Sequence, residues 1–148
     1  MKKLSFRPVT MEDAELILIW RNDIASRNNS FSQDEICMET HINWLEKKLA
    51  DVACQMFILA DDGEPVGQIR IDILGRIGEI SYLIAPGHRG KGYGTDILMQ
   101  CEKVVDKQIE VLAGLVKDEN KASKRCFEKV GYVKLNGGDT DCYIKIIN

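Results

Sequence analysis

Residues 66–73, VGQIRIDI, alternate strictly between apolar and polar positions. The three isoleucines fall on one face, and Gln68, Arg70 and Asp72 fall on the other. Such alternation predicts a β-strand with one covered face, and the turn residues DDGEP before it predict a hairpin with the preceding apolar segment. The remaining strands are predicted at residues 2–9, 54–60, 78–84, 110–116, 132–135 and 141–147.

Helical periodicity marks the segments between these strands. Thr10 is a predicted N-cap with Asp13 in the capping-box position, so a helix is expected to begin there. The polar stretch 22–35, rich in Asn and Ser, is predicted to be a mobile surface segment. The other helices are predicted from apolar stripes or a glycine stop: Met38, Ile42, Leu45 and Leu49; Ile97, Cys101, Val104 and Gln108; and a short helix ending at Gly131.

The order of these elements predicts an α/β (α+β) fold in one domain, residues 1–148. We expect a mixed, mostly antiparallel sheet of about seven strands with helices on both faces. Residues 110–116, EVLAGLV, are apolar throughout, as a strand covered on both faces would be. Because a helix crosses over between this strand and the one at 78–84, the two are predicted to run parallel.

Composition narrows the class of protein and its surroundings. The chain is 45% hydrophobic and 29% charged, which is typical of a globular domain, and its net charge of -3 argues against a nucleic-acid partner. The five cysteines are far apart and form no C-x-x-C pair, so neither a metal site nor a disulfide framework is expected. The start MKKLSFRP lacks the apolar core of a signal peptide, and the run LILIW is too short to cross a bilayer. A cytoplasmic protein without a membrane partner is therefore expected.

Glycines are concentrated in RGKGYGT, residues 89–95, between a predicted strand and a predicted helix. A Walker A loop would need Ser or Thr after Lys91, and a Rossmann fingerprint would need glycine where Thr95 stands. The remaining pattern is R-x-x-G-x-G, in which successive N–H groups can turn toward one anion with help from the helix dipole. Arg89 and Lys91 add positive charge. The pattern favours a pyrophosphate site, and a loop that merely caps the helix is the alternative.

These residues resemble the signature Q/R-x-x-G-x-G/A of the GNAT superfamily of acetyl-CoA-dependent N-acetyltransferases. In that family the signature follows a strand and opens a helix, as RGKGYG does here. A second landmark is an Asn that opens a later helix ending in Gly and an aromatic residue, which Asn120, Gly131 and Tyr132 match. The segment FRPVTMEDAELILIW is also similar to the family's first strand and helix. The resemblance covers nearly the whole domain and implies an N-acetyltransferase that uses acetyl-CoA as co-substrate.

The resemblance also implies where the co-substrate binds. The strands at 78–84 and 110–116 would splay apart, and the pantetheine arm would lie in the gap. Backbone groups of the first strand would pair with its amides, the glycine loop would hold the pyrophosphate, and Asn120 would contact the arm, although Asn120 could equally be a plain N-cap. The expected contacts are Leu83, Ile84, Arg89, Gly90, Lys91, Gly92, Tyr93, Gly94, Thr95, Asn120 and Phe127.

Two residues are candidates for proton transfer. Glu79 matches a Glu that several family members carry early in this strand, where it acts as a base through water; its alternative is a solvent-facing strand position. Many members place a Tyr at the position of Phe127 to protonate the departing thiolate, and Phe cannot donate a proton. Tyr82 is the candidate acid in its place, with Tyr132 or solvent as alternatives.

The acceptor side is expected in the first two helices, and the acceptor is expected to be a primary amine. Trp20, Arg21, Asn22, His41 and Trp44 form an aromatic and polar set that suits an anionic or sugar-bearing acceptor; the alternative is that the tryptophans are core and Arg21 is a helix-end cation. The pattern WRN followed by H-x-x-W resembles a branch of the family that acetylates nucleotide-linked amino sugars, and this acceptor is favoured.

Three other functions remain open. Protein N-terminal acetyltransferases that act on ribosomal proteins share much of the same outline. A module that binds acyl-CoA without transferring the acyl group is a second option. Association with RNA or ribosomes is weaker, because no basic stripe with interleaved aromatic residues occurs in the sequence. A homodimer is compatible with the sequence, which does not decide the oligomeric state.

Overall fold

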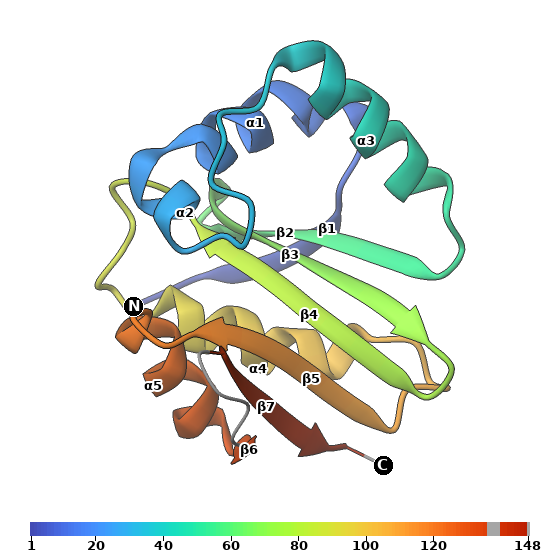
Figure 1. Ribbon diagram of the computed structural model, residues 1–148, viewed down its shortest axis with the longest axis vertical. Coiled ribbons are helices and arrows are strands. Elements are labelled where there is room, and N and C mark those ends of the chain that lie inside the picture. Colours follow the sequence, from blue (N-terminus) through green and yellow to red (C-terminus); the bar gives the residue numbers. More distant parts are fainter. Residues whose placement is uncertain (136–139, 148) are drawn as a thin grey trace.

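A single mixed sheet runs through the computed structural model, which describes residues 1–135 and 140–147. Within this described part its seven strands have the order β1-β2-β3-β4-β5-β7-β6 (Figure 1). Neighbouring strands are antiparallel except β4 and β5, which are parallel as predicted. The strands are β1 Leu4–Pro8, β2 Cys54–Asp61, β3 Glu64–Leu74, β4 Ile77–Ile84, β5 Val111–Lys117, β6 Val133–Leu135 and β7 Thr140–Ile146. The turn predicted between the last two strands lies mostly outside the described residues.

Helices cover both faces of this sheet, as predicted (Figure 1). On one face α1 and α3 pack over a core that includes Ile17, Leu45 and Ile58. On the other face α4 and α5 cover a larger core, to which the three isoleucines of β3 contribute. The helices are the 3₁₀ turn η1 Met11–Asp13, α1 Ala14–Asn22, α2 Ile24–Asn28, α3 Met38–Ala50, α4 Tyr93–Val104 and α5 Lys121–Val130.

The parallel pair β4–β5 separates along its length. Ile77 to Ile80 pair with Val111 to Gly114, and the register ends there although both strands continue. In Figure 1 the arrowheads of β4 and β5 accordingly lie farther apart than their tails. Residues 81–84 of β4 keep their pairing with β3, so the other backbone edge of this segment faces the gap without a strand partner. The splay implied by the family resemblance is therefore present.

One prediction about local helical structure was incomplete and another was wrong. The segment predicted to be a mobile surface stretch has no buried residue but contains α2, which begins because the side chain of Asp23 accepts a hydrogen bond from the Ser26 N–H (3.4 Å). In α3 the predicted stripe fails at Met38, whose side chain is 44% exposed. His41 occupies the buried position instead, because its ring nitrogens find partners inside the protein.

Two further predictions failed at the edge of the α4–α5 layer. α4 ends at Val104, so Gln108 lies beyond the helix, where its backbone N–H is held by the Asp106 carboxylate (3.0 Å). β5 is not covered on both faces: Leu112 is fully buried, whereas Leu115 is 49% exposed. An apolar sequence therefore overstates burial here, because beyond Gly114 β5 keeps β7 as a neighbour but has no strand partner on the β4 side.

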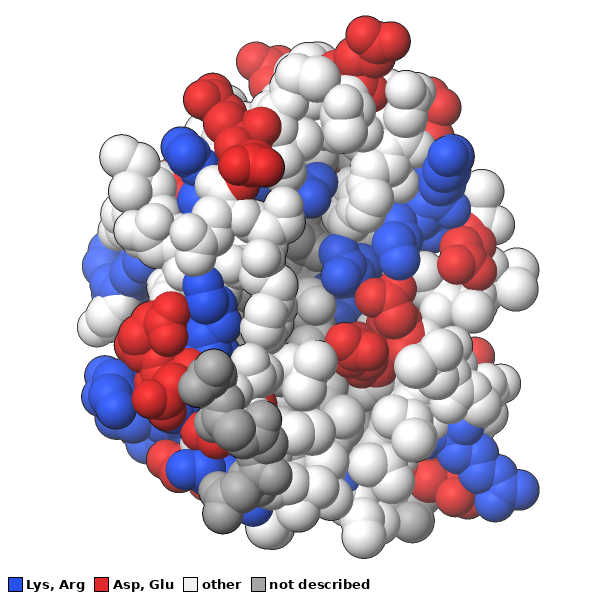
Figure 2. Space-filling model, viewed as in Figure 1, with Lys and Arg blue, Asp and Glu red and all other residues white. Residues whose placement is uncertain are grey.

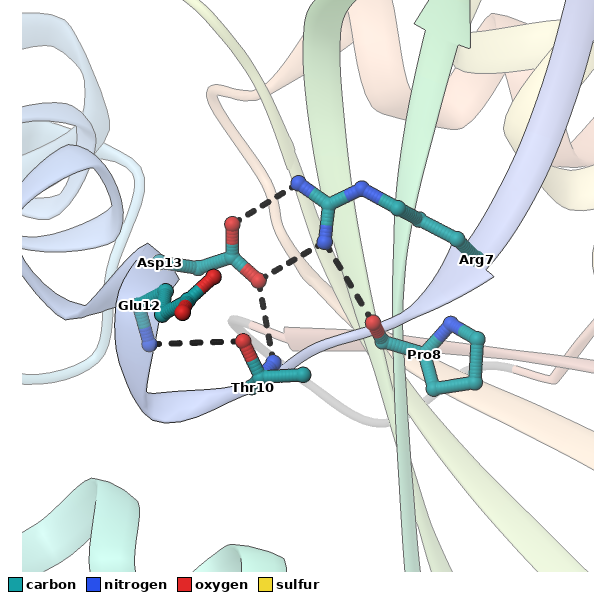
Figure 3. Close-up of polar contacts among 5 residues, drawn as sticks. All are labelled: Arg7, Pro8, Thr10, Glu12 and Asp13. Carbon is teal, nitrogen blue, oxygen red and sulfur yellow. Dashed lines mark hydrogen bonds and ion pairs between the residues drawn. The ribbon is translucent and has the colours of Figure 1, made fainter.

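The entry into α1 is fixed by a capping box and an ion pair (Figure 3). The Glu12 N–H donates to Thr10 Oγ1 (3.3 Å), and the Thr10 N–H donates to Asp13 Oδ2 (2.9 Å). The Arg7 guanidinium donates to both oxygens of Asp13, at 2.8 Å each. The predicted cap is therefore confirmed, and it also ties β1 to the helix that carries the acceptor side of the site.

The Asp13→Asn variant is expected to lower the free energy of unfolding by about 1.5–3 kcal/mol at pH 7, as hydrogen bonds to charged groups do. The hydrogen bond from Arg7 holds the pKa of Asp13 below its usual value. A carboxyl with a depressed folded-state pKa contributes stability above its unfolded pKa, about 3.9, and loses that contribution as the pH falls through the folded value. Urea unfolding at pH 7 and pH 3 checks this, with the exposed Asp34→Asn as the control. A deficit as large at pH 3 as at pH 7 would contradict the assignment.

Candidate active site

The glycine loop presents a row of free backbone donors at the start of α4. Gly90 and Gly92 have φ of +76° and +85°, so the chain makes left-handed turns that favour glycine, and Gly92 caps the helix. Within residues 1–135 and 140–147, the backbone N–H groups of residues 89–95 donate to no acceptor. A helix N-terminus with unpaired N–H groups attracts anions. The loop can therefore hold a phosphate or pyrophosphate.

The two basic side chains near this loop have different surroundings. Arg89 donates to Asp23 and to Ser26 of the α1–α2 region, both at 2.9 Å, so its charge is already paired. Lys2 lies under the loop, where its Nζ donates to the Lys91 carbonyl oxygen and to Asp96, both at 2.7 Å. The side chain of Arg89 therefore braces the loop against α2, while the side chain of Lys91 is exposed.

The first helix positions after the loop pack tightly against α5. A Cβ on Gly94 would lie 2.8 Å from the Cys126 sulfur and 3.5 Å from the Tyr82 hydroxyl. This close approach explains why glycine is needed at a position with ordinary backbone conformation. The ring of Tyr93 turns away from the loop and donates to Asp61 at 2.5 Å, so only its backbone faces the anion site.

Tyr82 places a hydroxyl beside the gap between β4 and β5. The hydroxyl is 2.9 Å from Ser123 Oγ, on the first turns of α5. Burial raises the pKa of Tyr82, and the neighbouring Cys126 raises it further. The phenol is therefore protonated over the whole physiological pH range. Asn120 is the N-cap of the same helix, because its side-chain oxygen accepts a hydrogen bond from the Ser123 N–H (3.3 Å). The amide NH₂ of Asn120 has no partner among the described residues.

Phe127 is a core residue. Its ring is 2% exposed and stacks on Tyr143 (centroids 5.5 Å apart) while meeting Tyr132 edge-on (4.9 Å). The end of the ring lies against Gly114 of β5, where a Cβ would collide with it. The expected contact of Phe127 with the co-substrate finds no exposed surface, because the ring fills the space that glycine leaves on β5.

Glu79 lies at the base of the splay on the α1–α3 face. It pairs with Ala113 one position before the β4–β5 register ends, and across from Asp72 of β3. Among the described residues no cation or hydrogen-bond donor contacts its carboxylate. Its charge helps to raise the pKa of the Cys142 thiol, on which burial has the larger effect. The Glu79 side chain is half-buried, and its carboxylate, which has no partner among the described residues, can accept a proton.

The acceptor side centres on Arg21, His41 and Trp44, which the structure brings together. Arg21 lies over the Trp44 ring (4.1 Å to its centroid) and donates to His41 Nδ1 at 3.0 Å. Because arginine can only donate, the other ring nitrogen carries the proton and donates to the Ala14 carbonyl (2.7 Å). Burial lowers the pKa of His41, so the ring is neutral.

Of the five predicted acceptor residues, two are buried and a third, half-buried, already uses its amide within the protein. Trp20 is 5% exposed and belongs to the core between α1 and the sheet. His41 is completely buried and acts through Arg21. Asn22 uses its amide on the backbone of Ile36, with both bonds at 2.8 Å, and so holds the loop before α3. Arg21 and Trp44 remain as half-buried surface of the site.

The sheet supplies acceptor-side residues that sequence reasoning missed. Arg70 lies 5.4 Å from the Trp44 ring on the side opposite the β3 isoleucines, and it donates to Asp72 (2.9 Å) and Ser81 (3.3 Å). Lys48 of α3 reaches the same Asp72 at 3.0 Å. Figure 2 shows this face hollowed between the helical layer and β4–β5, with basic and acidic side chains together beside the hollow. In the sequence, Arg70 and Asp72 stand at the polar positions of the β3 alternation, which by themselves do not tell a solvent-facing side chain from one that faces a helical layer.

Neither a metal-binding group nor a membrane-spanning helix occurs in the described part of the chain. No group of three or more His, Cys, Asp or Glu side chains is gathered there in a way that could hold a metal ion. None of the helices described is long and apolar enough to cross a membrane.

Comparisons with known proteins agree with this geometry. A family model described as the acetyltransferase (GNAT) family matches residues 18–132, whereas comparison with curated proteins gave no significant match. Among solved structures, the spermidine N-acetyltransferase of Vibrio cholerae in complex with CoA and spermine is 19% identical, with a TM-score of 0.84 over 97% of this chain and 95% of that one. Aminoglycoside acetyltransferase AAC(6')-Ib in complex with coenzyme A is 17% identical, with a TM-score of 0.82 over 97% and 95%. The ribosomal L7/L12 α-N-protein acetyltransferase RimL in complex with coenzyme A is 11% identical, with a TM-score of 0.79 over 97% and 93%.

Proposed function

The chain belongs to the acetyltransferase (GNAT) family, and on that premise we propose that it moves the acetyl group of acetyl-CoA to a primary amine held between α1, α3 and the sheet. One observation carries the proposal: seven consecutive N–H groups, of residues 89–95, are without an acceptor in the described chain at the start of α4. The diphosphate of coenzyme A supplies the anion that such a row requires. The unpaired backbone edge of β4, at Leu83 and Ile84, supports a place for the pantetheine amides beside it.

The chemistry is acyl transfer from a thioester to an amine. The acetyl carbon forms a bond to the amine nitrogen and loses its bond to sulfur, so the amine must lose a proton and the thiolate must gain one. For an amine of pKa about 10.4, deprotonation near pH 7 costs about 4.6 kcal/mol, whereas an α-amine of pKa about 7.8 costs about 1 kcal/mol. Positioning supplies much of the remaining rate, since aligned reactants reach effective molarities of about 10⁵–10⁸ M.

We assign the two proton transfers to Glu79 and Tyr82. Glu79 takes the amine proton through water, which its unpaired carboxylate on the acceptor face supports. Tyr82 gives a proton to the thiolate, which the place of its hydroxyl beside Ser123 and the gap between β4 and β5 supports. The two side chains leave β4 on opposite faces because they are three positions apart. The gap beyond Ile80 lets both approach one thioester.

The proposal also names the class of amine that accepts the acetyl group. The nucleotide-linked amino sugar stays our first candidate, on the WRN and H-x-x-W pattern, of which Arg21 and Trp44 line the site. The structures named above concern spermidine, aminoglycoside and ribosomal-protein acetylation, and no nucleotide sugar. A protein N-terminus is the second candidate, because RimL shares the fold. Offering both acceptors with acetyl-CoA and following thiol release separates them, and transfer to peptide N-termini alone would reverse the order.

The Gly90→Ala variant is expected to weaken CoA binding about tenfold. At φ +76° an alanine is strained by about 1–2 kcal/mol, which turns the neighbouring N–H groups away from a common anion. Gly63→Ala in the β2–β3 turn is the matched control, because its φ is +83° and its Cβ, like that of Gly90, meets open space. Calorimetric titration with CoA measures both variants. Equal affinities in the two, or no CoA binding by the wild type, would refute the proposed site.

This titration, together with a thiol-release assay on acetyl-CoA and amines, separates an enzyme from a module that only binds acyl-CoA. The enzyme binds CoA and releases thiol in the presence of an amine. Tight binding without turnover on any amine would favour the module.

A further inference from the structure

A guanidinium without an anionic partner stands at the acceptor side. Arg21 is half-buried, and among the described residues its one hydrogen bond is the donation to neutral His41. In the described part of the chain no carboxylate lies within ion-pair distance of it. Burial and, to a smaller extent, the nearby Arg70 together lower the pKa of Arg21 to about 10. A partly desolvated charge left unpaired is costly, so such a charge favours a ligand of opposite sign.

The neighbouring charged side chains do not neutralise the charge of the Arg21 guanidinium. Arg70 and Lys48 share a single carboxylate, that of Asp72 (2.9 and 3.0 Å). The two guanidiniums lie on the same indole, Arg21 at 4.1 Å and Arg70 at 5.4 Å from the Trp44 ring. Glu79, opposite Asp72, contacts none of these cations within the residues described. The cluster therefore keeps an excess of positive charge at Arg21.

A buried donor without an acceptor lies on the same face of the sheet. Gln68 is 5% exposed, and its Nε2 has no hydrogen-bond partner among the residues that the structure describes. It precedes Arg70 by two positions on β3, so both side chains point toward the α1–α3 layer. It pairs with Leu83 on the part of β4 that borders the gap. An unsatisfied buried amide is rare in proteins and marks a place where a ligand oxygen is expected.

We infer that the acceptor amine carries an anionic group, a carboxylate or a phosphate, that pairs with Arg21 and accepts from the donors of β3. This inference rests on the proposed function and specifies its substrate class. Spermidine and aminoglycosides, which the named neighbours acetylate, are polycations, and a polycation would meet Arg21 with like charge. The acceptor of this chain accordingly carries a negative charge, whereas those acceptors are positively charged.

Matched pairs of amines test the inference. Serine against ethanolamine isolates a carboxylate, and glucosamine 6-phosphate against glucosamine isolates a phosphate. We expect one anionic member to exceed its neutral counterpart at least tenfold in kcat/KM, and the pair in which this occurs identifies the source of the charge. Calorimetric binding of the same four amines to the CoA complex gives the comparison independently of turnover. Equal or better binding of both neutral members would overturn the inference.

Variants of Arg21 locate the effect. Arg21→Gln is expected to lower kcat/KM for the anionic acceptor about 10- to 100-fold and for its neutral counterpart about twofold or less, whereas Arg21→Lys keeps part of the preference. Arg76→Gln, at a side chain 76% exposed in the β3–β4 turn, is the control. An equal loss on both acceptors would show a merely structural role and contradict the inference. CoA affinity reports the proposed function separately: if CoA binds and amines are acetylated without preference for an anion, only the inference fails.

Discussion

The Phe127→Ala variant is expected to lose about 3–5 kcal/mol of unfolding free energy, the usual cost of removing a buried phenylalanine ring. The ring is 2% exposed and lies between Tyr132, Tyr143 and the backbone of Gly114, so its removal leaves a cavity that rigid neighbours cannot fill. Urea unfolding followed by far-UV circular dichroism measures the loss. Phe31→Ala is the control, because that ring is 62% exposed and surface changes usually stay within about 0.5 kcal/mol. A loss below about 1 kcal/mol would contradict the packing.

The same packing explains why the family's tyrosine is absent. A hydroxyl added by Phe127→Tyr would extend from the end of the ring toward Gly114, where even a Cβ has no room. We therefore expect that variant to be less stable and no faster in turnover than the wild type. If Phe127→Tyr were as stable as the wild type and turned over faster, the general acid would be at position 127 and Tyr82 would lose that role.

The Glu79→Gln variant is expected to lower turnover about 10²-fold or more, the usual contribution of a positioned general base. Glutamine keeps the size and the strand position of Glu79 but cannot take a proton. The remaining rate depends on amine that is already deprotonated, so the pH profile of turnover shifts upward, and the loss is larger for an amine of pKa about 10.4 than for one of about 7.8.

Steady-state kinetics between pH 6 and 10 check this expectation. Glu46→Gln on the exposed side of α3 is the matched control. Unchanged turnover in Glu79→Gln, with CoA affinity intact, would remove Glu79 from the mechanism. An equal fall in CoA affinity would instead indicate damage to the splayed strands.

Local signals predicted most of the fold. The capping pair Thr10 and Asp13, the alternating isoleucines of β3 and the left-handed glycines of the loop each depend on residues close in sequence. Short-range hydrogen bonds and backbone conformation leave such segments few alternatives. The predictions that failed depend on distant packing, as at Met38, which is exposed, and at the outer half of β5, which is paired with β7 but no longer with β4.

The candidate site was predictable only in part. The family motifs pointed to the glycine loop, Glu79 and Arg21. Arg70 and Gln68 were missed because a polar residue on an alternating strand is the same in sequence whether water or a helical layer covers it. The pairing of Arg89 with Asp23 was missed because it joins residues from two separate elements.

The amino-acid sequence by itself determined the succession of strands and helices and the family. It also determined the glycine loop, residues 89–95, whose backbone N–H groups cannot all be used within a helix. Those properties follow from backbone geometry and from patterns a few residues long. Tertiary structure alone decided that Trp20 and Phe127 are core, and that Arg21 has no anionic partner among the described residues while Asp72 pairs with two cations. Burial and charge pairing are properties of groups that meet in space, and the residues that meet here come from α1, α3 and β3, far apart along the chain.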